Sequence, residues 1–243
     1  MFWKKKNKCP VTAEDKEWIE EKLTWVDTNM IDLIRQPTVL PTKRYFDIDF
    51  SGKEQDAFDT LDIICDYFQV NPNRISLEFY SEESIQFDPG TQSKSENGTA
   101  GLYFQDGDEN TIMIEKSQLN MPNSLIATIA HELSHYIIME EKGYYFEEVE
   151  NEYLTDLTAI AYGFGIFLGN IKFRFNQWQS GDGWGGWSSS TQGYLPQQII
   201  AYTMAEIQKR KNNLQPTWQD HLKKDFKKDF MKSLNYIERE QSK

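Results

Sequence analysis

Two of the three histidines in the 243-residue chain, His131 and His135, stand four residues apart, and Glu132 directly follows the first. On an α-helix, side chains at positions i and i+4 lie one turn apart on the same face. Two imidazoles in this arrangement can bind one zinc ion, and the glutamate then lies beside the open side of the metal, where it can act as a base. The spacing therefore predicts a metal site with a base next to it.

The motif lies in a stretch that reads as a helix from about residue 122 to residue 140. Most of its side chains are apolar, but one face is polar and carries, at helical spacing, Ser124, Thr128, His131 and His135. Buried polar groups need partners, because an unpaired one costs free energy. Two histidines hydrogen-bonded inside a core are the alternative interpretation, but their spacing beside a glutamate favours a metal ion.

A second helix, expected over residues 146–169, carries Glu152 and Asp156 on one face. Its opposite side is apolar, so these carboxylates must be neutralised by a metal ion, by ion pairing or by protonation. A zinc ion held by two histidines lacks a third protein ligand, and Glu152 fits that vacancy, with Glu148 left as an alternative. Asp156 would then accept the outer N–H of a ligating histidine and fix its tautomer.

Upstream of the motif, the apolar pattern predicts two helices and a set of strands. One helix spans residues 12–35, where Thr12 and Asp15 are placed as a variant capping box, and the other spans residues 53–69. Alternation of apolar and polar residues predicts strands at 45–50, 75–80, 101–104 and 111–115. The last two strands form a hairpin around a polar turn.

Downstream of the second helix, residues 172–175 read as a short strand. Residues 180–190 are rich in Gly, Ser and Trp and form either a lid over the site or a loop pinned by its aromatic residues. A helix follows over residues 194–211, and Gln215-Pro216-Thr217 opens a last helix with an apolar stripe. His221 lies beside that stripe and reads as an exposed or packed histidine rather than a metal ligand.

No internal repeat or second composition regime appears, so we expect one domain over residues 1–243. Its core covers about residues 44–170, and helices at about 195–240 follow the core. The expected fold class is α+β, with a small mixed sheet and its hairpin packed on the two motif-bearing helices and a helical part at the C-terminal end. Hydrophobic residues make up 39% of the chain, which is enough for a packed core.

The net charge of −12 argues against nucleic acid as a partner, because phosphate binding needs clustered cations. The two cysteines, Cys9 and Cys65, are too few for a disulfide framework. No apolar region of a secretory signal follows the N-terminal lysine cluster, and no apolar run reaches the length of a membrane span. We therefore expect a cytoplasmic protein; the sequence leaves its oligomeric state open.

The motif residues resemble those of the zincin metallopeptidases, in particular the gluzincin branch, which pairs H-E-x-x-H on one helix with E-x-x-x-D on a following helix. Here the two motifs are His131-Glu132-Leu133-Ser134-His135 and Glu152-Tyr153-Leu154-Thr155-Asp156. The stretch from Glu152 to Asn170 is similar to a group of bacterial proteins that carry this zincin core. The resemblance implies zinc ligands at His131, His135 and Glu152, a general base at Glu132, and Asp156 as the partner of a ligating histidine.

The resemblance also implies an activity, a zinc-dependent hydrolase that acts as a peptidase on a peptide or protein substrate. In this family an edge strand binds extended peptide, and residues 111–115 are the candidate. A downstream tyrosine or histidine stabilises the oxyanion, and Tyr194, with Tyr202 as a second choice, would take that role. The alternatives are a non-catalytic zinc-binding module for structure or interaction, and a regulatory peptidase restricted to one protein target.

Overall fold

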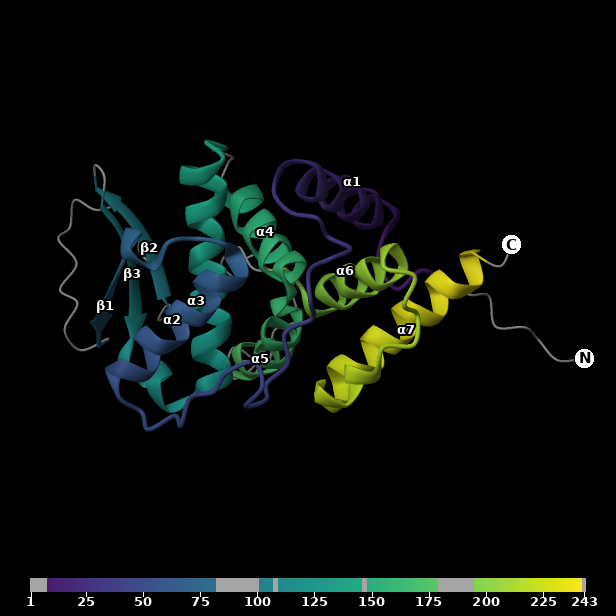
Figure 1. Cartoon of the computed structure of the whole chain (residues 1–243). Helices are drawn as coiled ribbons and strands as arrows, with labels where there is room; N and C mark the ends of the chain where they lie inside the picture. Colours follow the sequence, from purple (N-terminus) through teal and green to yellow (C-terminus); the bar gives the residue numbers. More distant parts are fainter. Residues whose placement is uncertain (1–7, 82–100, 107–108, 146–147, 179–194, 242–243) are drawn as a thin grey trace, which may run out of the picture. The chain divides into compact units, whose positions relative to one another are not determined.

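The computed structural model describes residues 8–81, 101–106, 109–145, 148–178 and 195–241. The fold is α+β, as predicted, with helices and a small mixed sheet (Figure 1). The chain divides into two compact units. The described residues of 41–159 form one, called the mixed unit below, and the described residues of 8–40, 160–178 and 195–241 form the other, called the helical unit. The expectation of a single domain stays a prediction.

The sheet of the mixed unit contains β1 (Ile75–Tyr80), β2 (Gly101–Asp106) and β3 (Glu109–Glu115) in the order β1-β3-β2. β1 runs parallel to β3, and β2 pairs with β3 antiparallel. The predicted strand and hairpin are therefore confirmed. The prediction that residues 111–115 form an edge strand is wrong, because β3 is the central strand and is hydrogen-bonded on both sides.

The predicted strand at 45–50 is also wrong. The N–H groups of Tyr45 and Phe46 donate to the carbonyl of Thr42, which makes a turn, and residues 46–50 pair with no strand among the described residues. Burial nevertheless alternates here, since Phe46 and Ile48 are buried and the aspartates that follow each are exposed. The alternation in the sequence therefore reflects which side chains face the core. It does not indicate a strand, because no described strand lies beside the segment and pairs with it.

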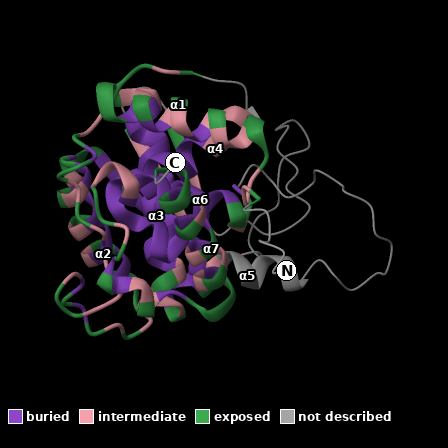
Figure 2. Ribbon diagram, turned by 90° about the vertical axis from the view of Figure 1, so that its right-hand side faces the viewer, coloured by how far each residue is buried: buried purple, intermediate pink, exposed green. Residues whose placement is uncertain are grey.

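Three helices complete the mixed unit: α2 (Glu54–Phe68), α3 (Pro122–Tyr136) and α4 (Glu148–Ala159). α3 contacts β2, α2 and α4. Every α3 residue from Leu125 to Tyr136 is buried, and the ribbon of this helix lies in the buried interior (Figure 2). A helix packed on several sides explains why the motif segment is apolar around most of its surface. After a π-helical turn at Ile137–Glu141, the chain leaves α3.

The second motif helix was expected to run unbroken to residue 169, but α4 ends at Ala159 and a π-helical segment, Ile160–Phe164, precedes α5 (Gly165–Trp178). The break falls at Gly163, whose φ of 104° suits glycine because side chains rarely adopt it. The Gly163 carbonyl accepts from Val39 N at 3.0 Å, and a Cβ at Gly163 would collide with the Pro37 carbonyl. Residues 172–175 lie within α5, so the predicted strand there is wrong.

The rest of the helical unit comprises α1 (Ala13–Asn29), α6 (Gln197–Arg210) and α7 (Lys224–Gln241). The capping box of Thr12 and Asp15 is confirmed, but α1 ends six residues before the expected position 35. The last helix starts later than predicted, because residues 217–221 form a 3₁₀ turn. One segment of the described chain, Glu150–Ile171, has the length and hydropathy of a membrane span, and 94% of its apolar window is buried.

Candidate metal centre

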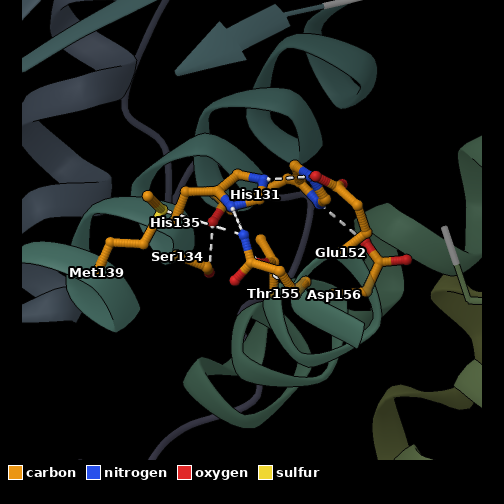
Figure 3. Close-up of polar contacts among 9 residues, drawn as sticks. His131, Ser134, His135, Met139, Glu152, Thr155 and Asp156 are labelled. Carbon is orange, nitrogen blue, oxygen red and sulfur yellow. Dashed lines mark hydrogen bonds and ion pairs between the residues drawn. The ribbon is translucent and has the colours of Figure 1, made fainter. Parts of the chain in front are cut away.

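α3 and α4 bring three potential ligands together (Figure 3). His131 and His135 come from α3 and Glu152 from α4, and one ligand atom of each lies within 4.8 Å of the other two. Glu152 Oε2 is 3.2 Å from His131 Nε2, and Glu152 Oε1 is 3.3 Å from His135 Nε2. These three side chains, which the sequence singled out as ligands, form a group that could hold a metal ion.

The outer nitrogens of both imidazoles face hydrogen-bond acceptors. His131 Nδ1 lies 3.0 Å from Asp156 Oδ1, and Asp156 is buried. His135 Nδ1 lies 3.1 Å from Thr155 Oγ1, whose own hydroxyl donates to the carbonyl of Asn151 at 2.8 Å. The threonine oxygen is therefore left to accept from the histidine. With a proton on Nδ1, each ring would satisfy this contact and present its Nε2 lone pair to Glu152, which is the tautomer that metal ligation requires.

The arrangement of lone pairs between the two histidines and Glu152 suits a cation. With both Nδ1 atoms protonated, two Nε2 lone pairs face the two oxygens of the Glu152 carboxylate. Acceptors that face one another repel unless a proton or a cation lies between them. Without a metal a proton can take that place: burial would lower the pKa of His131, but its hydrogen bonds to Asp156 and Glu152 raise the pKa to about 10. The group thus meets the requirements of a cation site.

Glu132 lies next to the ligands and is also buried, with 4% of its surface exposed. Burial raises the pKa of its carboxyl, and the nearby His131 and His135 oppose that shift. Its carboxylate faces the first residue of β2, since a Cβ built on Gly101 would lie 3.2 Å from Glu132 Oε1 and 2.5 Å from Thr128 Cγ2. Only glycine therefore allows β2 to approach α3 this closely, and that approach closes one side of the site.

The structure adds three residues that the sequence reasoning did not single out. Tyr103 on β2 stacks on His135, with an interplanar angle of 11° and ring centroids 6.4 Å apart. Asn151 and Thr155, one helical turn apart on α4, face the outer nitrogen of the same histidine. The α4 pair could have been found by extending the ligand face of the helix, but a contact between the hairpin and His135 needs tertiary structure.

The remaining candidate residues either lie outside the described part of the chain or belong to the helical unit. Tyr194, the side chain of Glu148 and residues 180–190 lie outside the described part of the chain. Tyr202 belongs to the helical unit, where it is 1% exposed on α6 with its ring 6.4 Å from that of Tyr236. His221 also belongs to the helical unit, and its carbonyl accepts from Asn170 Nδ2 at 2.8 Å.

No protein-family model, curated protein or solved structure matches the chain. The comparisons therefore assign neither a family nor a reaction. What the site can do follows from the chemistry of its three ligands, from the buried Glu132 beside them, and from the strand that borders them.

Proposed function

We propose that the chain is a zinc-dependent hydrolase of the gluzincin type that cleaves amide bonds in peptides. One observation carries the proposal: two imidazole Nε2 atoms and a carboxylate converge within 4.8 Å, and a buried glutamate that is not a member of this group follows the first histidine directly. A purely structural metal site has no use for such a base, whereas a hydrolytic site requires one.

Zinc is the metal that this donor set favours. Two neutral imidazoles and one carboxylate match the three protein ligands of catalytic zinc sites, in which the fourth position stays open. Carboxylate-rich oxygen sites suit magnesium or calcium better, and no such set surrounds these histidines among the described ligands. When bound, zinc would lower the pKa of a water molecule and polarise the substrate carbonyl.

The residues of the chain would divide the remaining work. Glu132 would take a proton from the attacking water and deliver it to the leaving amine, and its burial keeps the carboxylate close to the reacting atoms and away from bulk solvent. Asp156 and Thr155 would hold the two imidazoles in the tautomer that ligation needs. None of these residues has to move far, because the site is already assembled between two packed helices.

The structure suggests β2 as the strand that receives the peptide, in place of residues 111–115. β2 is an edge of the sheet, and among the described strands it pairs only with β3. An extended peptide can add to such an edge through backbone hydrogen bonds. Gly101 places the start of this edge against Glu132, so a peptide paired there would pass beside the base and the ligands.

The test uses zinc-loaded wild-type protein and the variant Glu132→Gln on a proteolytic digest of denatured casein, with new termini identified by mass spectrometry. We expect cleavage by the wild type, full zinc binding by the variant and a rate about 10³-fold lower, because general base catalysis contributes on the order of 10²–10⁴-fold. Cleavage by the variant at the wild-type rate would refute the role of Glu132. A wild-type protein that binds zinc but cleaves neither casein peptides nor native cellular proteins would indicate the non-catalytic module instead.

A further inference from the structure

One face of β2 runs along α3 and the π-helical turn that follows it. Gly101 lies against Thr128 and Glu132, Tyr103 stacks on His135, and Gln105 Nε2 donates to Glu140 Oε2 at 2.6 Å. Alternate strand residues point to the same face, so these three contacts belong to a single surface of the strand. Tyr103 is the member of this surface that touches a ligand of the candidate metal site.

Tyr103 is itself held in place at both ends. Its backbone pairs with Ile112 of β3, which is fully buried. Its hydroxyl donates to Asn110 Oδ1 at 2.7 Å, and Asn110 lies on the same strand as Ile112. An aromatic ring fixed by its backbone and by its hydroxyl loses little further freedom when it packs, so it can serve as a rigid wall.

His135 is bordered by rings on two sides. The Tyr103 ring lies nearly parallel to it, and the His131 ring meets it edge-on, with centroids 4.9 Å apart and an interplanar angle of 82°. Offset-parallel and edge-to-face contacts at these distances are the favourable geometries for aromatic pairs. Rotation of the His135 imidazole about its Cβ–Cγ bond would break both contacts.

The two ligating histidines differ in how their outer nitrogens are held. His131 Nδ1 faces the charged carboxylate of Asp156 at 3.0 Å. His135 Nδ1 faces only neutral groups among its described hydrogen-bond partners, the hydroxyl of Thr155 at 3.1 Å and the amide of Asn151 at 3.5 Å. Hydrogen bonds to charged partners are shorter and stronger, so the orientation of His135 depends more on packing than that of His131.

We infer that Tyr103 is a positioning residue for the metal: its ring, anchored through Asn110, holds the His135 imidazole in the orientation that aims Nε2 at the ion. The inference rests on the metal site of the proposed function but not on peptide hydrolysis. In this account β2 has two roles. It would bind the peptide at its edge, and through Tyr103 it would orient His135, one of the metal ligands.

The experiment is a titration of the metal-free full-length protein with Co²⁺, followed by the visible d–d absorption, which reports the geometry of the bound ion. Tyr103→Leu and Tyr103→Val both remove the ring, and circular dichroism selects the better folded of the two. We expect Co²⁺ affinity to fall about 10-fold and the d–d spectrum to change, because loss of a group that orients a ligand typically weakens metal binding by about 10- to 100-fold. Tyr103→Phe keeps the ring and should stay close to the wild-type affinity and spectrum.

The matched control is Phe104→Leu, which alters the neighbouring residue on the opposite, solvent-facing side of β2, where Phe104 is 49% exposed. An unchanged affinity and spectrum in the ringless variant would overturn the inference, and so would an equal loss in Phe104→Leu. A wild-type protein that binds no Co²⁺ would refute the metal site itself. A protein that binds Co²⁺ as expected but cleaves no peptide would refute hydrolysis and leave the role of Tyr103 intact.

Discussion

His131 Nδ1 lies 3.0 Å from Asp156 Oδ1, in a pair that joins α3 to α4 and is almost completely removed from solvent. Because a carboxylate only accepts hydrogen bonds, Asp156 favours the tautomer with the imidazole proton on Nδ1, in which Nε2 could bind a metal ion. The same contact therefore joins α3 to α4 and orients the imidazole of His131, a potential metal ligand. A conservative change at Asp156 should therefore affect metal affinity more than folding.

Asp156→Asn keeps an acceptor oxygen but removes the negative charge. We expect zinc affinity to fall about 10-fold, since partners of ligating histidines are typically worth about 10- to 100-fold in metal affinity. Competition with a chromophoric chelator measures the change. Asp62→Asn, an exposed carboxylate on α2, serves as the control for the lost charge. Equal affinities in the wild type and Asp156→Asn would show that the contact does not prepare the ligand.

Thr155→Val removes the acceptor for His135 Nδ1 with little change in volume. We expect the zinc affinity to fall by about 10-fold, because the tautomer of His135 is no longer fixed by that hydroxyl. Thr158→Val provides a close control, since the Thr158 hydroxyl is buried one turn further along and has no hydrogen-bond partner among the described residues. That control should keep its affinity and gain up to about 1 kcal/mol of stability, because it removes an unsatisfied polar group. Similar metal affinities in the two variants would contradict the assignment.

Gly101→Ala should separate β2 from α3, because the new Cβ would lie 2.5 Å from Thr128 Cγ2. We expect a loss of about 1–3 kcal/mol in the free energy of unfolding, the usual cost of overpacking, together with a lower hydrolytic rate. Thr128→Ser removes the colliding methyl group, so the double variant should recover much of the stability. Urea denaturation of the two single variants and the double variant gives the coupling energy. If the changes in unfolding free energy of the two single variants simply add up in the double variant, the contact between Gly101 and Thr128 does not explain the loss of stability.

Asp56 stabilises the start of α2, where its carboxylate accepts from the N–H groups of Ser51 at 2.6 Å and Gly52 at 2.8 Å. Burial would raise its pKa, but these backbone hydrogen bonds outweigh burial and lower it. A carboxyl with a lowered folded-state pKa stabilises the protein above its unfolded pKa of about 4, and this contribution is lost as pH falls through the folded value. We expect Asp56→Ala to cost about 2 kcal/mol at neutral pH.

The pH dependence provides the check on Asp56. In urea denaturation, the difference between the wild type and Asp56→Ala should shrink as pH falls below about 4, where the unfolded chain becomes protonated, and should be lost below the lowered pKa of the folded carboxyl. Asp62→Ala, on the same helix but exposed, should show neither the loss nor the dependence on pH. A stability difference that stays constant down to about pH 2 would show that the Asp56 charge is not what stabilises the helix start.

The sequence was sufficient to predict which residues of the site lie together on the same helix. The spacing of His131 and His135, and of Glu152 and Asp156, is a property of helix geometry, so their grouping could be inferred from residue positions alone. The strand order could not, because residues 111–115 alternate equally well at the edge or the centre of a sheet. The same limit applies to residues 45–50, whose alternation reflects burial without pairing, and to Tyr103, which reaches His135 only through tertiary packing.

The proposed function depends above all on His131, His135 and Glu152 holding one zinc ion together. The decisive measurement is the zinc content and zinc affinity of protein purified without added metal, for the wild type, Glu152→Ala and the control Glu150→Ala on the same helix. We predict one zinc ion per chain in the wild type and the control, and an affinity at least about 100-fold lower in Glu152→Ala, which loses one of three protein ligands. A wild type without zinc, or a Glu152→Ala variant that binds zinc as tightly as the wild type, would contradict the proposed site.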